Sequence, residues 1–265
     1  MEQVRAIVVR AAGINCDMET EHAFRLAGAE VDRVHVNRII ETPGMLEGYQ
    51  IFVLPGGFSY GDDVAAGKIL ANQMVHHLAD ALRKFIDDGK LVLGICNGFQ
   101  VLVKTQILPG LAPIGGSDTS QQPVSITNND SGKYEDRWVY LEPVSEECVF
   151  ISPGRRLYLP VAHGEGKVVA RDSAILDRLE AEGHVAFRYV DAEGRQGPFP
   201  INPNGSPNSV AGLTDSTGRV LGLMPHPERF VHRTQHPHWT RRANRDDADG
   251  MSVFSNAVAY VKQNL

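Results

Sequence analysis

The sequence predicts an α/β fold in which a mostly parallel, doubly wound open sheet is flanked by helices. Two observations lead to this class. Short apolar, β-branched runs alternate with helix-period segments over the first hundred residues, and such repetition is typical of parallel sheets with helices on both faces. Strand-like runs then continue as far as residue 224, so we expect extra β-strands beyond the parallel core. In sheets of this kind, ligands bind at the carboxyl ends of the strands.

Strands and helices alternate through the first part of the chain. Acidic residues after residue 13 favour a helix N-terminus, and Gly28 can end that helix. Leu78, Leu82 and Phe85 recur at helical spacing on a longer segment that a glycine follows. The expected strands are 6–9, 31–36, 51–54 and 91–94, and the expected helices cover about 17–27, 66–85 and 99–104.

The second part of the chain is richer in strands. Residues 109–132 are rich in Gly, Pro, Ser, Gln and Asn without periodicity, so we expect loops there. A polar, His- and Arg-rich stretch at 232–249 is expected to form a surface excursion. Without an internal repeat or a second core, residues 1–265 are expected to form a single domain. The expected strands are 138–141, 157–161, 167–170, 185–190, 210–214 and 220–224, with helices at 172–182 and at the C-terminus.

Composition limits the partners and the compartment. The chain has 265 residues, with 26 Lys and Arg against 32 Asp and Glu, and carries a net charge of −6 without a basic block. Nucleic acid and anionic membranes are therefore not expected as partners. The three cysteines form no C-x-x-C pair, and we see neither a signal-peptide core nor a run of about 18 apolar residues. We expect a cytoplasmic protein.

Cys96 lies in Gly94-Ile-Cys96-Asn-Gly98-Phe-Gln100, between an expected strand and an expected helix. The pattern is that of a nucleophile elbow, with sulfur in place of the hydroxyl of G-x-S-x-G. Gly94 and Gly98 permit the crowded turn, and the N–H groups at the helix start favour a thiolate. The alternative, a buried structural cysteine, does not explain the two glycines. The pattern therefore predicts a catalytic nucleophile.

Two His-x-Glu pairs compete for the base that a thiolate nucleophile needs. His226 and Glu228 lie in Pro-His226-Pro-Glu228, directly after an apolar strand, and the prolines stiffen the backbone. In extended backbone, side chains two residues apart point the same way, so Glu228 can hold the imidazole. The alternative is a proline-rich surface turn. His163 and Glu165 are the rival pair, in a glycine-rich segment that is equally compatible with a solvated hairpin.

The segment Pro55-Gly56-Gly57-Phe58 follows the third expected strand. Glycines in this position let backbone N–H groups approach a ligand, and acyl transfer through a thiolate develops an oxyanion that needs such donors. The expected donors are the N–H of Asn97 and one from the Gly56/Gly57 loop. Without the cysteine elbow, the segment would indicate only a turn.

Other candidate residues carry weaker signals. Cys16 follows the first strand but lacks the glycine-flanked elbow. His232, His236 and His238 have no cysteine or ordered carboxylate beside them, so we expect no metal site. Neither G-x-G-x-x-G nor a Walker A sequence is present, so nucleotide binding by this chain is not supported.

The cysteine elbow with its following Gln, the upstream Pro-Gly-Gly and the late His-Pro-Glu together resemble the class I glutamine amidotransferases. Longer motifs are similar to the family of glutaminase subunits of phosphoribosylformylglycinamidine synthases. The surface excursion 232–249 departs from that family by its length. The longer motifs are Gly13-Ile-Asn-Cys-Asp17, Pro55-Gly-Gly-Phe-Ser-Tyr-Gly-Asp62, Ala162-His-Gly-Glu-Gly166, Asn202-Pro-Asn-Gly-Ser206 and Met224-Pro-His-Pro-Glu-Arg229.

This resemblance implies a class I amidotransferase fold, which is flavodoxin-like, and the fourth step of purine biosynthesis. L-Glutamine would be hydrolysed, and its ammonia would pass to a separate synthase subunit, with a small accessory subunit as a further partner. The chain itself would carry no cofactor, and ATP and Mg²⁺ are expected on the synthase. The implied roles are Cys96 as nucleophile, His226 as base, Glu228 as its orienter, Gly57 and Asn97 as oxyanion donors, and Gly56, Phe58, Gln100, His163, Gly164 and Glu165 as glutamine-binding residues.

Other functions are compatible with the same residues, including that of another class I amidotransferase subunit. A cysteine hydrolase or glyoxalase-like protein on a similar sheet usually carries a histidine directly after the nucleophile, where this chain has Asn97. A degenerate domain that only docks on a synthase and regulates it is the non-enzyme alternative. The joint presence of Cys96, His226 and Glu228 argues against that alternative.

Overall fold

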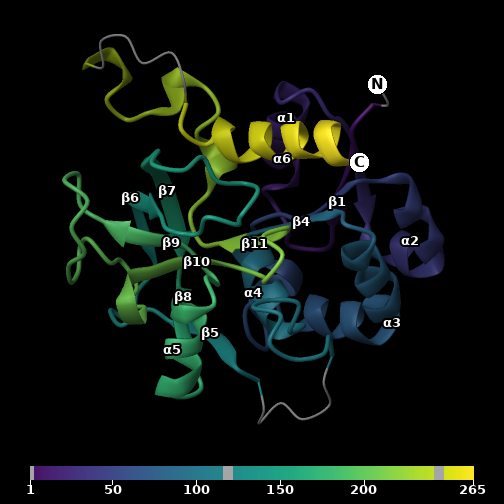
Figure 1. Cartoon of the computed structure of the whole chain (residues 1–265), viewed down its shortest axis with the longest axis horizontal. Helices are drawn as coiled ribbons and strands as arrows, with labels where there is room; N and C mark the ends of the chain where they lie inside the picture. The colour runs from purple at the N-terminus through teal and green to yellow at the C-terminus, as the bar shows by residue number, and fades with distance from the viewer. Residues whose placement is uncertain (1–2, 116–121, 242–247) are drawn as a thin grey trace.

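A nine-stranded sheet runs through the computed structural model, which describes residues 3–115, 122–241 and 248–265 (Figure 1). The strand order is β2-β1-β3-β4-β11-β10-β9-β6-β7, and β5 and β8 form a separate two-stranded sheet. The strands are β1 (Arg5–Arg10), β2 (Glu30–His35), β3 (Ile51–Leu54), β4 (Leu91–Ile95), β5 (Val124–Asn128), β6 (Glu135–Pro143), β7 (Leu157–His163), β8 (Glu165–Ala170), β9 (Val185–Val190), β10 (Val210–Thr214) and β11 (Val220–Leu223).

The large sheet has a parallel half and an antiparallel half. Strands β2, β1, β3, β4 and β11 are all parallel, in the order found in flavodoxin-like folds. Every residue of β3 and β11 is buried, as expected for strands covered on both faces. Antiparallel pairing then adds β10, β9, β6 and β7. Because β9 is separated from β11 by two antiparallel pairings and β7 by four, both point the same way as the parallel strands. The mostly parallel sheet with extra strands is thus confirmed.

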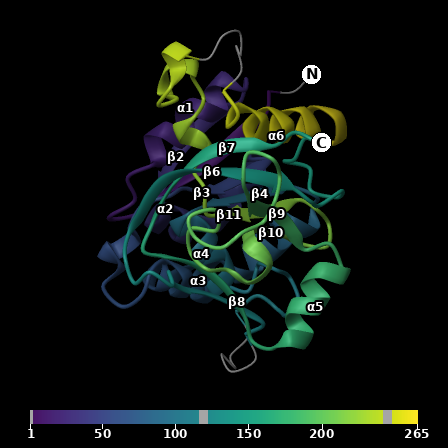
Figure 2. The ribbon, with the colours of Figure 1, turned by 90° about the vertical axis from the view of Figure 1, so that its left-hand side faces the viewer.

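Helices cover both faces of the parallel half (Figure 1). The first and last helices, α1 and α6, lie together on one face, where the rings of Phe24 and Phe254 meet edge to face at 4.9 Å. Helices α3 and α4 lie on the other face. Figure 2 shows β6 and β7 on the near side of the molecule, between these two layers. The helices are α1 (Asp17–Leu26), α2 (Val36–Glu41), α3 (Lys68–Asp87), α4 (Asn97–Lys104), α5 (Ser173–Ala181) and α6 (Met251–Asn264).

Short 3-10 helices, labelled η, occupy several of the connections. Two of them lie next to candidate site residues: η2 follows Phe58 and η5 follows His226. The 3-10 helices are η1 (Pro43–Gly48), η2 (Ser59–Asp62), η4 (Pro207–Ser209), η5 (Pro227–Arg229), η6 (Arg233–Gln235) and η7 (Trp239–Arg241).

Two elements differ from the sequence-based expectation. The loops expected over 109–132 contain strand β5, which pairs with β8; the interpretation as loops was wrong because polar neighbours masked the alternation of buried Val124 and Ile126. Residues 116–121 of that stretch lie outside the described residues. Helix α2 was also not predicted, because its six residues are too few to show a helical period.

The expected surface excursion is described at residues 232–241 and 248–249, and residues 242–247 lie outside the described residues. Most of its described side chains up to residue 241 are exposed. His236 is the exception: it is buried and packs against the rings of Trp138, Tyr158 and Phe230. This contact attaches the excursion to the β6–β7 side of the sheet.

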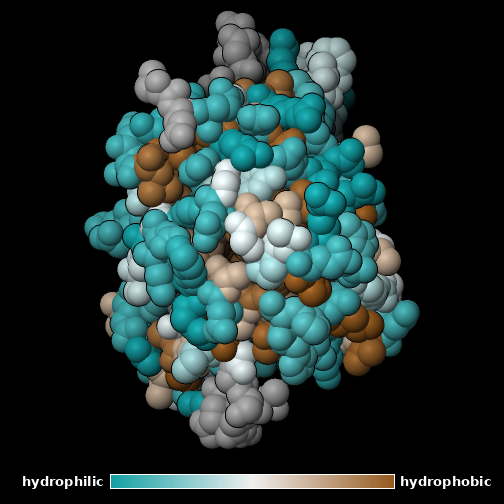
Figure 3. Space-filling view, turned by 90° about the vertical axis from the view of Figure 1, so that its right-hand side faces the viewer, coloured by the Kyte–Doolittle hydropathy of each residue, from teal (hydrophilic) through white to brown (hydrophobic). Residues whose placement is uncertain are grey.

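The outer surface is largely hydrophilic on the face shown in Figure 3, where the hydrophobic areas are small and separated. Among the described residues, none of the helices combines the length and the apolar character that crossing a membrane requires.

Candidate active site at the carboxyl edge of the sheet

Residues at three strand ends line a cavity of about 190 Å³. Cys96 follows β4, Gly57 follows β3 and His163 ends β7, and all three line the cavity. His163 can reach it because β7 points the same way as the parallel strands. The cavity also contains residues that the sequence reasoning singled out and some that it did not. The first group is Phe58, Gln100, Gly164 and Glu165, and the second is Asp62, Ala66, Asn128, Tyr134 and Ala162.

The backbone at Cys96 is strained in the way that an elbow requires. Its φ is +50° and its ψ is −106°, a conformation that L-residues rarely adopt and that costs of order 1–3 kcal/mol. The Cys96 N–H donates to Leu223 O at 2.8 Å, and its Sγ lies 3.7 Å from Ala162 O. A Cβ on Gly98 would lie 1.9 Å from Leu54 O. The elbow therefore fits directly against β3, and only glycine is possible at position 98.

His226 and Glu228 form a buried hydrogen-bonded pair. The Nδ1–H of His226 donates to Oε1 of Glu228 at 2.6 Å, and both side chains are almost fully inaccessible. Their alignment comes from η5, a 3-10 turn that Pro227 begins, and not from the extended backbone that we expected. The N–H of His226 is anchored on Pro160 O of β7 at 2.8 Å. The pair therefore lies between β11 and β7.

The charge on Glu228 determines the protonation of His226. Burial lowers the pKa of His226, but Glu228 and the thiols of Cys96 and Cys16 outweigh burial, so the pKa lies well above 6.5. Within the described part of the chain, Nε2 of His226 makes no hydrogen bond of good geometry. The Cys96 thiol is close enough to interact with the imidazole, so Nε2 is the nitrogen available to it.

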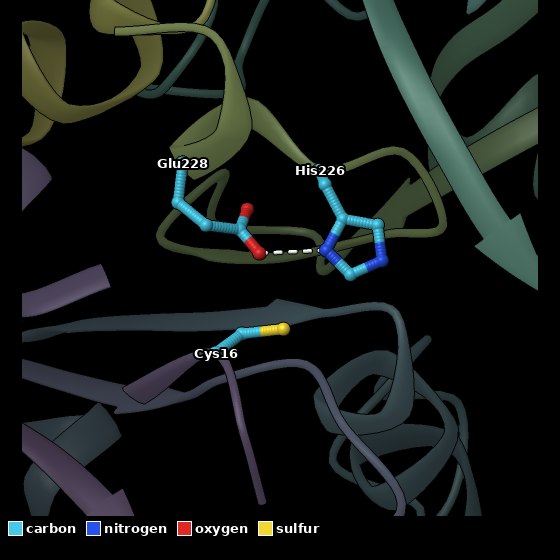
Figure 4. A group of neighbouring side chains, drawn as sticks. All are labelled: Cys16, His226 and Glu228. Carbon is cyan, nitrogen blue, oxygen red and sulfur yellow. Dashed lines mark hydrogen bonds and ion pairs between the residues drawn. The ribbon is translucent and has the colours of Figure 1, made fainter. Parts of the chain in front are cut away.

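Cys16 lies beside this pair, as Figure 4 shows. Ligand atoms of Cys16, His226 and Glu228 lie within 4.8 Å of one another, and these residue types can hold a transition metal. Two of the three are already engaged with each other, and Arg229 donates to Cys16 Sγ at 3.1 Å. Burial raises the pKa of the Cys16 thiol. We therefore interpret the group as a histidine–carboxylate pair with a neutral thiol packed beside it.

Glycines after β3 bring backbone against the imidazole. A Cβ on Gly56 would lie 2.7 Å from Cε1 of His226. Gly57, with φ at +139°, faces Ile14 in an antiparallel bridge whose hydrogen bond runs from Phe58 N to Gly13 O. Because Gly57 and Ile14 are opposite each other but do not exchange hydrogen bonds, the N–H of Gly57 points away from Ile14.

The side chain of Asn97 connects three walls of the cavity. Its Oδ1 accepts from Ser59 N, and its Nδ2 donates to Oδ1 of Asp62 and to Oε1 of Gln100, at 2.9–3.2 Å. Gln100 in turn donates from Nε2 to Glu165 O. Only a role for the backbone of Asn97 was predicted from the sequence. Its buried side chain links the loop after β3 to α4 and, through Gln100, to the start of β8.

His163 does not pair with Glu165, in contrast to the rival interpretation above. Its ring bonds Oδ1 of Asn129 at 3.0 Å, and that oxygen also accepts from Gly166 N. Asn129 Nδ2 donates to two carbonyl oxygens, so its Oδ1 is the acceptor and His163 carries its proton on Nδ1. Burial, with the nearby charge of His226, lowers the pKa of His163 to about 4. Its Nε2 is therefore an acceptor, and it has no partner among the described residues.

Comparisons with known proteins identify the family of the chain. Residues 3–261 match the model of the CobB/CobQ-like glutamine amidotransferase domain. A protein from Dehalococcoides mccartyi, phosphoribosylformylglycinamidine synthase subunit PurQ, is 44% identical over 99% of this chain and 100% of its own length. The chain belongs to the PurQ family of glutamine amidotransferases.

Further relatives extend the same similarity. The PurQ subunit of Methanococcus maripaludis is 38% identical over 97% of each chain. Among solved structures, a chain in the structure of PurLQS from Thermotoga maritima matches with a TM-score of 0.72 and 30% identity, over 98% of this chain and all of that one. A glutamine amidotransferase of the same organism matches with a TM-score of 0.55 at 16% identity, which supports the fold alone.

Some residues of the site were missed by sequence reasoning. Asp62 and Tyr134 line the cavity, and Cys16 lies beside His226. Asp62 ends a motif that was used for the family resemblance, so its position after a strand was a usable signal. Tyr134 reaches the cavity from the segment before β6, and no local pattern indicates this because the contact depends on tertiary packing.

Proposed function

We propose that this chain, as a single domain, hydrolyses L-glutamine to glutamate and ammonia with Cys96 as nucleophile, His226 as acid and base, and Glu228 as the residue that orients His226. The observation that carries the proposal is the buried 2.6 Å bond from His226 to Glu228, behind an elbow cysteine whose cavity also contains Gly57. A carboxylate in this position selects the Nδ1–H tautomer and stabilises the imidazolium.

The thioester forms first. The Cys96 thiolate attacks Cδ of the glutamine side chain, and the N–H groups of Gly57 and Asn97 hold the oxyanion that develops; one such donor contributes about 2.7–4 kcal/mol to barrier stabilisation. The imidazolium of His226 then gives its Nε2 proton to the departing nitrogen, and the C–N bond breaks. The products of this half-reaction are ammonia and a γ-glutamyl thioester on Cys96.

Hydrolysis of the thioester completes the cycle. Neutral His226 removes a proton from water, and the resulting hydroxide attacks the thioester carbonyl. The tetrahedral intermediate expels the Cys96 thiolate and releases glutamate, so that the thiolate–imidazolium pair is restored. Gly56, Phe58, Gln100, His163, Gly164 and Glu165 would hold the substrate during both steps.

The ammonia would be used by a synthase subunit that makes formylglycinamidine ribonucleotide in purine biosynthesis, with a small accessory subunit in the same cytoplasmic complex. ATP and Mg²⁺ would act on the synthase and not on this chain. Exposed aromatic rings at the cavity mouth support a docked partner: Phe58 and Tyr134 stack at 6.4 Å and are both about half exposed. Covering them would also close the cavity and retain ammonia.

The decisive experiment replaces the nucleophile. Cys96→Ala should abolish ammonia release from L-glutamine, measured with the synthase subunits present, without changing the unfolding temperature by more than a few degrees. A glutamine-like diazoketone should add one adduct to the wild type and none to the variant, as measured by intact mass. Cys148→Ala is the matched control, since Cys148 is also a buried thiol but does not line the cavity. Normal turnover by Cys96→Ala would exclude the proposal.

A further inference from the structure

Hydrogen-bond acceptors are concentrated in the cavity beside Cys96. The acidic residues Asp62 and Glu165 both line it, as does His163, whose nearly fully buried Nε2 is an unpartnered acceptor among the described residues. A cavity with such walls is complementary to a ligand that is rich in N–H donors. Glutamine has two donor groups, the carboxamide that reacts at Cys96 and the α-ammonium at its other end.

Asp62 is held in place more firmly than a surface carboxylate. Its Oδ1 accepts hydrogen bonds from Gly67 N and from Asn97 Nδ2, both at 3.2 Å. Asp62 also ends a run of three residues, from Tyr60 through Gly61, with φ values of +56°, +71° and +54°. Such left-handed backbone at non-glycine residues is costly and is concentrated at functional sites. The loop therefore holds the Asp62 side chain in place with a strained backbone.

The charges at this wall favour a cation. Burial raises the pKa of Asp62, and the negative charge of Glu165 raises it further. The charge of Lys104 lowers the pKa of Asp62 in part, but Lys104 does not line the cavity, and burial lowers its own pKa. A positive ligand group placed between Asp62 and Glu165 would relieve the repulsion between the two carboxylates.

We propose that Asp62, with Glu165 beside it and Asn97 holding it in position, binds the α-ammonium group of the substrate and makes the site specific for an α-amino acid amide. This inference rests on the proposed glutaminase function. It makes Asp62, in η2 after β3, a specificity-determining residue, and it gives the Asn97 side chain a positioning role in addition to the oxyanion role of its backbone N–H.

The experiment compares two amides that differ only at the α-carbon. L-Glutamine and glutaramate, which lacks the α-amino group, are each supplied to the wild type and to Asp62→Asn in the presence of the synthase subunits. We expect kcat/KM for L-glutamine to fall about 10- to 100-fold in the variant, the range for losing a hydrogen bond to a charged group. The value for glutaramate should change by less than about threefold, because that substrate has no ammonium group to lose.

Two further variants separate recognition from folding. Asp63→Asn makes the same charge change on an exposed neighbour and should leave the preference for L-glutamine intact. Asp62→Glu keeps the carboxylate and should recover part of that preference, even if Asp62→Asn is less stable. Equal losses on both amides, or an unchanged ratio in Asp62→Asn, would overturn the inference. If the glutaminase proposal itself were wrong, the wild type would turn over neither amide.

Discussion

Two His-x-Glu segments lie close enough for their histidines to interact, and they differ in charge. At the end of β11, His226 bonds the carboxylate of Glu228 and has a raised pKa. At the end of β7, His163 bonds the amide of Asn129 and has a pKa lowered to about 4. The spacing in sequence is identical. The first histidine is therefore suited to carry a proton, whereas the second remains a neutral acceptor.

Local backbone explains the difference. Pro227 begins a 3-10 turn that folds Glu228 back onto the imidazole. Glu165 instead begins β8, where its backbone carbonyl accepts from Gln100. The partner of a histidine, and with it the protonation state at neutral pH, is thus determined by the conformation of the two residues that follow. A His-x-Glu pattern alone does not identify a catalytic pair.

The largest expected effect comes from exchanging the two histidines for glutamine. His226→Gln should lower kcat by on the order of 10⁴-fold or more, because acid and base functions are lost together. His163→Gln removes only an acceptor and should lower kcat by no more than about tenfold, with a higher KM for L-glutamine. Steady-state ammonia release by the complex measures both. An equal collapse in His163→Gln would make His163 the better candidate for the base.

The carboxylates provide the next comparison. Glu228→Gln should lower kcat by about 10²- to 10⁴-fold, because the imidazolium loses its stabilising charge and its fixed tautomer. Glu165→Gln should act mainly on KM, since Glu165 lines the cavity, whereas His163 bonds Asn129 and His226 bonds Glu228. The acidic limb of the kcat profile should move in Glu228→Gln only. A change confined to KM in both variants would contradict the assignment of Glu228.

The smallest expected effect is on the pH dependence of the free energy of unfolding. The folded pKa of His163 lies below its ordinary value of 6.5, so the unfolded chain binds more protons on acidification. The contribution of neutral His163 to the free energy of unfolding is complete above pH 6.5 and is lost as the pH falls towards about 4. Between pH 7 and pH 5, the loss should be about 2 kcal/mol. For His226 the sign is opposite: its contribution is present below 6.5 and is lost as the pH rises through the raised folded pKa.

Urea unfolding of the wild type and of His163→Gln at these two pH values tests this point. The difference in free energy of unfolding between the two proteins should shrink by about 2 kcal/mol on acidification. Asn37 and other exposed polar residues offer no such dependence, so an uncharged surface substitution such as Asn37→Gln serves as the control. A difference that stays constant with pH would mean that His163 is not held neutral.

Local patterns in the sequence predicted the elements that carry the reacting groups. The apolar runs at β3, β4 and β11 and the glycines around Cys96 are properties of a few adjacent residues. Strand β5 was not predicted, because polar neighbours surround its two buried side chains. Other features depend on contacts between segments that are distant in the chain, so no local pattern predicts them. They are the bond from His163 to Asn129, the position of Cys16 and the contacts of the Asn97 amide.

The adjacency of β4 and β11 has a consequence for biosynthesis. Val92 is in register with Val220, and Cys96 N donates to Leu223 O, so β4, which already pairs with β3, gains its second neighbouring strand only after β5 to β10 have been synthesised. Pairing between residues so far apart is slow, because the loop must close before the contact stabilises it. During synthesis, Cys96 is therefore made well before His226. The thiol and the imidazole can form a reactive pair only after both halves of the sheet have folded.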